Sequence, residues 1–557
     1  MKIINFSAAL TLLLPLTLSA AFLDLTHAPS LSYQPMTFQI PGSSQQVEHC
    51  LPITTFPDSK LKSKRKKEEI KLCSYNIYDT GLATHPKVKE LAACPKTYNS
   101  STAIEFYKIP KGMTKREFQR KVCPMGRNER KRFSDRNKYP TKLAKFKFTS
   151  PGVTTGSILG YYQLARFLDA AEVPASVLRT VAIDFALDMS LTGLYLSRKA
   201  RSKFLSKYWS QQSYIFVNSM FDSTSSVPRS VANDRRYGLG IVPNGYFLNN
   251  RRLRSASIGH WSERQLTSDQ RQVVGVLAKN PRGERYYAEI SGLKTRRTRI
   301  DQFRKGSVYY KPLQINRSLE RVLGSRDLKK VGQKLKGMQD TSNLLVIDFL
   351  MGQSDRVGNI HYYDYYYYTN SEGKLKRIKE DSYKKLLKIP TAELSEKQQL
   401  VLQQLKVKGV ELKVMLLKDN DGGFDLNKAK KYHLLAKVKR SSSSFRKWKN
   451  RPELYRNSSM VVKHFDPKVY KRLVKLYRWL ENGSARQQEI TDYLQNELRF
   501  TDQELKKFKN NLTALYNALY YNCLKGDLFL DLSLKEYFSN DQSRTNLSQQ
   551  EVCEGQW

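Results

Sequence analysis

Hydrophobic and polar positions along this chain follow two different periods, which predicts a mixed α+β protein. Residues 143–148 (LAKFKF) alternate as a strand does, and residues 272–278 (QVVGVLA) form an apolar run of strand length. Between them, residues 156–168 carry apolar side chains at helical spacing. Residues 22–60 are mixed in character and contain several prolines, so we expect an irregular arm there.

The second half of the chain also alternates between helical and strand-like segments. A buried helix is expected at residues 340–352, with Asp340 or Ser342 as its cap and Gly352 at its end. An aromatic strand, HYYDYYYY, follows; we interpret it as part of an amphipathic hairpin, with an aromatic platform for sugar or peptide as the alternative. The other expected elements are a return strand at 375–378, a Gln-rich helix at 395–408, a strand at 410–417 and mainly helical structure at 468–523.

The N-terminus has the pattern of a secretory signal at residues 1–21. Lys2 is followed by an apolar stretch, and Ser19, Ala20 and Ala21 are small residues suited to cleavage. The alternative is a membrane anchor, but the apolar stretch is short for spanning a bilayer. We therefore expect a cleaved, exported protein that is secreted, periplasmic or in a secretory lumen, and soluble once the signal is removed.

Cysteine usage agrees with export. The chain has six cysteines, an even number, as is usual in oxidising compartments. Two bridges are expected within the first four and one between the last two, while the pairing within the first group stays open. The cysteines are Cys50, Cys73, Cys94 and Cys123 in the first group, and Cys523 and Cys553 in the second.

The charge of the chain is strongly positive. There are 96 basic and 51 acidic residues, a formal net charge of +45. Such a surface attracts polyanions, including nucleic acid, acidic glycans and acidic protein segments. The basic runs at residues 60–71 and 115–138 are interpreted as solvated surface within a basic, disulfide-bonded extension at 22–138. No nucleic-acid-binding signature accompanies the charge.

Two acidic loops between residues 348 and 424 carry the candidate chemistry. Asp355 and Asn359 follow the helix at 340–352, and Asp419 follows the strand at 410–417. Phosphoryl transfer needs one carboxylate near the acceptor proton and another on the metal that bridges the nucleotide phosphates. An amide oxygen suits the same metal, because Mg²⁺ prefers oxygen ligands. The alternatives are a salt bridge beside an ordinary turn, or a calcium loop, which would lack its terminal Glu.

The amino-acid sequences of these loops resemble those of a known family. IDFLMGQSDRVGN, LLKDNDGGF and LLAKVKRSS are similar to segments of the secretory-pathway kinases that phosphorylate casein-like proteins and proteoglycan xylose. Weaker similarity, in the same order, spans roughly residues 140–530, and only the first two motifs are specific.

The resemblance implies a two-lobed protein-kinase-like fold. Its small, β-rich N-lobe would occupy 139–280, and its mainly helical C-lobe 281–557, with a tyrosine-rich insertion at 361–415. It implies ATP with Mg²⁺ or Mn²⁺ as cofactor, and an exported acceptor, either protein or glycan; the basic surface would suit an acidic one. The implied site consists of catalytic Asp355, metal ligands Asp419 and Asn359, and nucleotide contacts at Lys145 (alternatively Lys147), Val276 and Arg440.

Departures from the family pattern leave three functions open. The helix after the lysine strand normally carries a Glu, but the corresponding positions here are Ser157, Ile158 and Leu159. Asn359 comes four residues after Asp355 rather than five. The chain is therefore expected to be an active kinase, with a pseudokinase scaffold and a non-catalytic polyanion-binding protein as alternatives.

Overall fold

A computed structural model describes most of the chain. The described residues are 36–39, 47–59, 63–76, 89–98, 101–126, 129, 142–148, 153–220, 266–267, 272–281, 284–285, 307–353, 356, 359–424, 460–539 and 547–557. The expected signal sequence at 1–21 lies outside these residues. The fold is mixed α+β, as the hydrophobic periodicity predicts.

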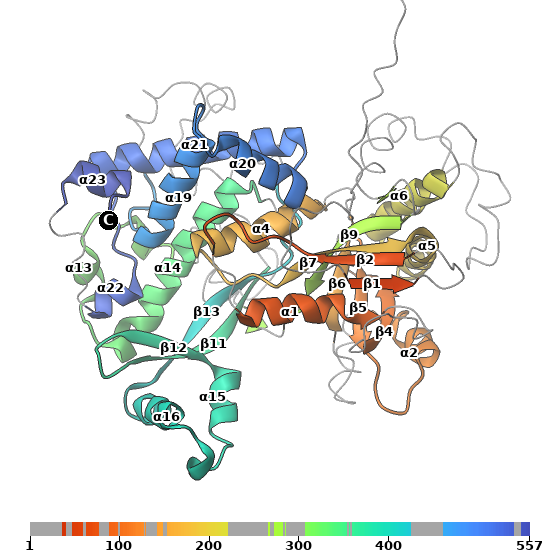
Figure 1. The fold of residues 1–557 in the computed structure, drawn as a ribbon, viewed down its shortest axis with the longest axis horizontal. Coiled ribbons are helices and arrows are strands. Elements are labelled where there is room, and N and C mark those ends of the chain that lie inside the picture. The colour runs from red at the N-terminus through yellow and green to blue at the C-terminus, as the bar shows by residue number, and fades with distance from the viewer. Residues whose placement is uncertain are drawn as a thin grey trace, which may run out of the picture.

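The larger of two sheets contains nine strands in the described part of the chain (Figure 1). Neighbouring strands run antiparallel, except for the parallel pair β3–β4. In spatial order the strands are β1 (Met36–Gln39), β2 (Val47–Pro52), β7 (Ser176–Ala182), β9 (Gln272–Lys279), β6 (Lys142–Lys147), β5 (Ile104–Lys108), β4 (Lys89–Pro95) and β3 (Tyr75–Asn76), with β8 (Leu266–Thr267) paired to β9.

The expectation of an irregular arm at residues 22–60 is wrong where β1 and β2 lie. β1 and β2 form an antiparallel pair, and β2 pairs with β7, more than a hundred residues along the chain. Strands of four and six residues are too short to give a clear period, so their partner in the sheet decides their conformation. The described part of 22–138 thus shares one sheet with residues 142–279.

Helices cover both sides of this sheet. Trp209 is buried on α6 with its ring beside Phe148, and Gly193 of α5 approaches it so closely that a Cβ would lie 2.6 Å from the indole. Within the basic run at 60–71, the helix α1 buries Glu69 and exposes Lys67 and Lys71, and Leu72 just after the run is buried. The helices are α1 (Ser63–Cys73), α2 (Lys115–Val122), α4 (Thr155–Leu168), α5 (Ile183–Lys199) and α6 (Lys203–Met220).

In the view of Figure 1, the smaller sheet lies below the helical part of the molecule, with one end directed toward the larger sheet. Its central strand β11 pairs with the other three strands. The strands are β10 (Glu284–Arg285), β11 (Ile360–Thr369), β12 (Leu375–Lys379) and β13 (Val410–Leu417), and α15 (Glu380–Leu386) and α16 (Glu396–Lys408) lie between β12 and β13 in the chain. The expected hairpin at 361–378 and the strand at 410–417 are therefore present.

The rest of the described chain is mainly helical. The helix expected at 340–352 is α14 (Leu328–Leu350), which begins earlier because Asp327 caps its N-terminus. Asp340 is therefore no cap; it lies mid-helix, where its carboxylate accepts from the Met415 N–H (2.8 Å). The other helices are α13 (Leu319–Leu323), α19 (Pro467–Leu480), α20 (Gln487–Asp492), α21 (Asp502–Leu524), α22 (Leu534–Ser539) and α23 (Gln549–Glu554).

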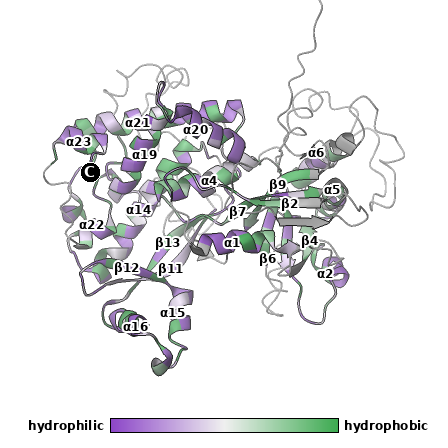
Figure 2. Cartoon of the chain, viewed as in Figure 1, coloured by the Kyte–Doolittle hydropathy of each residue, from purple (hydrophilic) through white to green (hydrophobic). Residues whose placement is uncertain are grey.

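One hydrophobic core runs from the larger sheet into the helical part. It joins residues of β9, α4, α14 and α21. The distribution of hydrophobic residues accounts for this continuous core. In Figure 2, hydrophobic and hydrophilic residues alternate around most helices, whereas β9 is hydrophobic along most of its length. A smaller cluster lies under α2. The continuous core fixes the two parts of the molecule against each other, and the candidate site lies where they meet.

All three expected disulfides are present. They join Cys50 to Cys73, Cys94 to Cys123 and Cys523 to Cys553. The first two resolve the pairing that the sequence left open. Such bridges persist in oxidising compartments, which is compatible with export. Within the described residues, every helix is too short or too polar to cross a bilayer.

Candidate functional site

Two lysine side chains of β6 project to the same side because the strand alternates. Phe146, between them, packs into the core beside Phe148. Lys145 and Lys147 leave the opposite face, where their side chains are 14% and 4% exposed. Lys147 is thus a buried cation, which is a costly state unless a carboxylate compensates it.

The carboxylates come from the loop after β13. This hydrophobic strand pairs with β11 along its whole length and ends at Leu417. Asp419 then adopts a left-handed backbone conformation, with φ at 48°. Aspartate visits that region more readily than most residues do, because its short side chain can bond locally. The turn at Asp419 directs the next three residues back toward α4.

The start of α4 holds this loop in place. The Ser157 hydroxyl donates to the carbonyl of Asn420 (2.7 Å), and the Thr154 N–H donates to the carbonyl of Asp421 (2.9 Å). Gly423 approaches so closely that a Cβ there would lie 2.2 Å from the Ser157 hydroxyl oxygen. Ser157, one of the three positions at which the resemblance leads us to expect an acid, therefore fixes the loop backbone.

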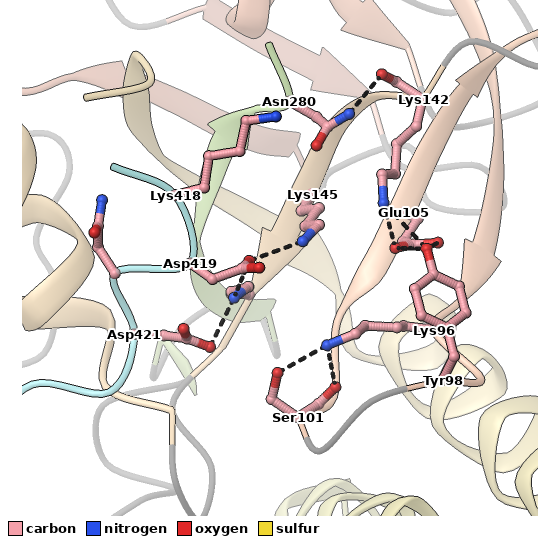
Figure 3. A network of polar contacts seen from close by, with 12 residues as sticks. Lys96, Tyr98, Ser101, Glu105, Lys142, Lys145, Asn280, Lys418, Asp419 and Asp421 are labelled. Carbon is pink, nitrogen blue, oxygen red and sulfur yellow. Dashed lines mark hydrogen bonds and ion pairs between the residues drawn. The ribbon is translucent and has the colours of Figure 1, made fainter. Parts of the chain in front are cut away.

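Lysines and aspartates meet in a compact ionic cluster (Figure 3). Lys145 Nζ lies 2.8 Å from Asp419 Oδ1, and Lys147 Nζ lies 3.3 Å from the same oxygen. Lys147 Nζ also contacts Asp421 Oδ2 at 2.7 Å. Lys145 and Asp419 are 274 positions apart in sequence, so only the tertiary fold creates this cluster.

The cluster controls the ionisation of its members. Burial alone would raise the pKa of Asp419, but the charges of Lys145 and Lys147 hold that pKa well below its usual range. Burial lowers the pKa of Lys145, with partial compensation from Asp419. Burial also works against the Lys147 ammonium, yet Asp421 and Asp419 raise its pKa above the ordinary lysine value. Asp419 is therefore an anion, and Lys147 a cation, throughout the neutral range.

A small cleft, partly open to solvent, lies beside the cluster. Its wall combines the ionic cluster with apolar side chains from α4, from the segment before β7 and from the end of β9. The lining residues outside the cluster are apolar Ile158, Val173, Pro174 and Ala278, and polar Ser176, Lys279, Asn280, Lys418 and Asn420. An apolar wall next to fixed charges suits a ligand with one flat apolar part and one ionic part.

A second ionic network supports the other side of the loop. Arg356 Nε lies 2.9 Å from Asp348 Oδ2, and its NH2 donates to Asn420 Oδ1 at 2.9 Å. Its NH1 donates to the carbonyl of Lys418 at 3.1 Å. The guanidinium also lies over the Tyr161 ring, 5.0 Å from its centroid. Arg356 thus ties the end of α14 to the Lys418 backbone and the Asn420 side chain, on either side of Asp419.

The predicted site residues are brought together in part. Lys145, Lys147 and Asp419 share the cluster described above. Asn359 lies beside it, since its carbonyl accepts from the Lys418 N–H (3.0 Å). Val276 pairs with Lys147 across the sheet and is fully buried, whereas Ala278 of the same strand lines the cleft. Predicted residues Asp355 and Arg440 lie outside the described residues.

Two charged residues of the site were not predicted. Asp421 follows Asp419 by two positions, and the acidic composition of DNDGGF was a signal for it. Lys96, whose charge acts on the same cluster, lies in the extension at 22–138. Nothing in the local sequence separates it from the other lysines of this basic chain, and the strand pairing that brings it close is long-range.

Comparison of the chain with models of known protein families, with curated proteins and with solved structures finds no match. Within the described residues, moreover, no three His, Cys, Asp or Glu side chains gather as a ready-made metal site. The geometry of the ionic cluster and its cleft is therefore the basis for a functional assignment.

Proposed function

We propose that this protein is an exported kinase, which transfers the γ-phosphate of ATP to a hydroxyl of an exported protein or glycan. The observation that carries the proposal is the cluster of Lys145 and Lys147 with Asp419 and Asp421 at the wall of a cleft. Phosphoryl transfer is catalysed mainly by positioning and by charge, and requires a phosphate-binding cation close to a metal-binding carboxylate.

In this proposal the protein has the two-lobed arrangement of protein kinases. The larger sheet with its helices is the N-lobe, and the smaller sheet with the helical part is the C-lobe. β6 contributes the lysines from one lobe, and the loop after β13 contributes the carboxylates from the other. The relation to secretory-pathway kinases rests on the two sequence motifs, which include Asp419.

The lining of the cleft, which is partly open to solvent, suits the two chemical parts of a nucleotide. The base would lie against Val173, Pro174 and Ala278, and the phosphates would extend toward Lys145 and Lys147. This orientation follows from chemistry, since the purine is flat and apolar and the phosphates are anionic.

The residues present also fit a divalent cation. Mg²⁺ and Mn²⁺ prefer carboxylate oxygens, and Asp419 and Asp421 offer two carboxylates from one turn. Both carboxylates accept hydrogen bonds from lysine ammonium groups, so a metal would share or replace these contacts. Asn359 stays a predicted third ligand. The metal would neutralise charge on the nucleotide phosphates while the lysines hold them.

The proposed reaction is a single displacement. The oxygen of the acceptor hydroxyl forms a bond to the γ-phosphorus as the bond from that phosphorus to the bridging oxygen of ADP breaks. The acceptor proton passes to a base, and the resemblance assigns that role to Asp355. A basic protein surface would favour acidic acceptors.

A pseudokinase is the second candidate, and Ser157 favours it. Kinases of the resembled family use an acid at this point of the helix, either to pair with the lysine or to bind metal. Here Ser157 bonds the Asn420 carbonyl instead, and both lysines pair with the aspartates of the opposite loop. Such a site would bind nucleotide but turn it over slowly or not at all.

The test separates binding from transfer. The protein is purified from an oxidising compartment as the wild type and as D419N, D421N and D355N, with exposed Asp492 on α20 changed in a control variant, D492N. An active kinase is raised in Tm by ATP with Mg²⁺ and transfers labelled phosphate to itself or to acidic proteins. D419N loses both responses, D355N loses only transfer, and D492N keeps both.

The other outcomes identify the alternatives. A nucleotide-dependent rise in Tm without transfer in the wild type supports the pseudokinase. Salt-sensitive binding of polyanions, with no response to nucleotide or metal, supports a non-catalytic basic protein and refutes the kinase.

A further inference from the structure

Lys96 is a buried lysine held in a fixed position. It directly follows β4, beside the Cys94–Cys123 bridge, and is only 3% exposed. Its N–H donates to the carbonyl of Ala103 (2.9 Å), and its carbonyl accepts from the Trp209 indole N–H (3.0 Å). The backbone of Lys96 is therefore fixed from both sides before any ligand arrives.

The charge of Lys96 has only neutral partners. Its ammonium donates to the carbonyl and to the hydroxyl of Ser101, both at 2.9 Å. The other two lysines that are buried in the described part of the chain each contact a carboxylate: Lys147 contacts Asp421, and Lys336 contacts Asp340 at 2.8 Å. Lysines are almost never fully buried unless paired, and an uncompensated buried charge is strongly destabilising.

The side chain of Lys96 is directed to the candidate site (Figure 3). Its charge is within electrostatic range of Lys145, Lys147, Asp419 and Asp421. Burial lowers the pKa of Lys96 to about 7, and the two neighbouring lysines lower it further than the aspartates raise it. With all three lysines protonated, the cluster holds three positive charges against two negative ones, so it lacks an anion.

We propose that Lys96 is a third phosphate-binding lysine of this site, and that its missing counterion is the phosphate chain of the bound ligand. The inference rests on the proposed nucleotide-binding function and extends it to a residue outside the motifs of the resembled kinases. A phosphate oxygen offers Lys96 a charge-assisted hydrogen bond that Ser101 cannot provide. Because the backbone is already fixed, little ordering is needed on binding.

A purely structural role for Lys96 and the proposed phosphate-binding role predict opposite effects of replacing Lys96 on Tm. If Lys96 serves to close the β4–β5 turn through Ser101, replacing it removes two hydrogen bonds and lowers Tm. If Lys96 is an uncompensated charge awaiting a ligand, K96M removes an unfavourable burial, and its Tm is at or above that of the wild type. Loss of phosphate affinity together with retained stability is therefore the signature of the proposed role.

The experiment measures affinity and Tm in the full chain as wild type, K96M, K96R and the control K336M. The probes are ATP and adenosine with Mg²⁺, and inorganic tripolyphosphate. We expect K96M to bind ATP and tripolyphosphate about ten- to a hundredfold more weakly, the equivalent of one charge-assisted bond. Adenosine binding stays the same, and K96R recovers part of the loss. K336M breaks the pair with Asp340, so its Tm falls while its ATP affinity is unchanged.

The outcomes distinguish this inference from the proposed function. Unchanged ATP affinity in K96M overturns the role of Lys96 and leaves the kinase proposal standing. If the wild type binds tripolyphosphate through Lys96 but binds neither ATP nor adenosine, the phosphate site stands and the nucleotide function fails. A wild type that binds none of the three probes refutes both.

Discussion

The two ionic networks on either side of the loop at residues 418–421 differ in how completely they are satisfied. Arg356 spreads its guanidinium over Asp348, Asn420 and the Lys418 carbonyl, and its side chain is 5% exposed. The lysine cluster opposite has more cations than carboxylates, and the Asp419 side chain is 30% exposed at the cleft. One network is closed, and the other is open to a ligand.

The difference shows how one loop can be rigid and still reactive. Arg356 holds the Lys418 carbonyl and the Asn420 side chain, the residues on either side of Asp419. The Asp419 carboxylate is thereby held at the cleft, and Asp421 lies next to it in a buried ion pair with Lys147. A site whose loop is already held in place in this way needs little reorganisation when a ligand binds.

The largest effect is expected from opening the closed network. R356M leaves the Asp348 carboxylate buried without its cation, which should lower the free energy of unfolding by about 3–5 kcal/mol. Denaturant unfolding of the two proteins measures the change. The matched control is R326M, because Arg326 pairs with Glu320 at the exposed surface and such pairs contribute about 1 kcal/mol or less. Equal effects of the two variants would contradict the distinction between the networks.

A smaller effect is expected from D419N in the open network. Asp421 still compensates Lys147, and solvent screens the cleft, so the free energy of unfolding should fall by about 1–3 kcal/mol. Because the pKa of Asp419 is held below its usual range, this stabilisation is present above the unfolded-state pKa. It is lost as the pH falls through about 4 toward the lower folded-state value. A difference between wild type and variant that persists undiminished at still lower pH would refute the ion pairing.

The charge of Lys96 should give a pH dependence of the same sign at higher pH. Its folded-state pKa is lowered to about 7, mainly by burial, whereas the unfolded-state value is about 10.4. Between these values the unfolded chain binds more protons, so the wild type gains stability as the pH rises. Relative to K96M, we expect a gain of about 3 kcal/mol between pH 7 and 10, measured as paired unfolding curves. A flat difference would indicate that Lys96 has an ordinary pKa.

The smallest effect is expected from Y161F. The Tyr161 hydroxyl donates to Asp348 at 2.6 Å, but Arg356 continues to compensate that carboxylate after the change. The loss should be about 1 kcal/mol, the contribution of a single hydrogen bond. A double-mutant cycle with R356M measures the coupling. Additive effects would show that Tyr161 and Arg356 do not act as one network.

Local pattern predicted the elements that carry the site. The period-two alternation of LAKFKF placed Lys145 and Lys147 together on one face of a strand, and the structure confirms that strand. The apolar run before KDNDGGF predicted a strand that presents Asp419 at its end, and this is confirmed as well. The catalytic role of Asp355 and the phosphate contact of Arg440 stay predictions.

Long-range pairing explains what local pattern did not predict. β1 and β2 were interpreted as part of an irregular arm because neither is long enough to have a period of its own. Asp340 or Ser342 was expected to cap the helix. The helix begins earlier, at Leu328, and Asp327 caps its N-terminus. The Asp-Arg dipeptide at 355–356 was interpreted as part of the catalytic site, yet Arg356 pairs with Asp348 and supports the loop on the side opposite the lysine cluster.

The sequence by itself determined the α+β class, the number of disulfides, the strong positive charge and the two strands that deliver lysine and aspartate. These properties depend on composition and on contacts a few residues apart. Only the tertiary structure decided that Lys145, Lys147, Asp419 and Asp421 meet, that Arg356 closes one network, and that Lys96 is buried without a carboxylate. Those contacts join segments far apart in the chain, and their energies depend on burial, which no local pattern records.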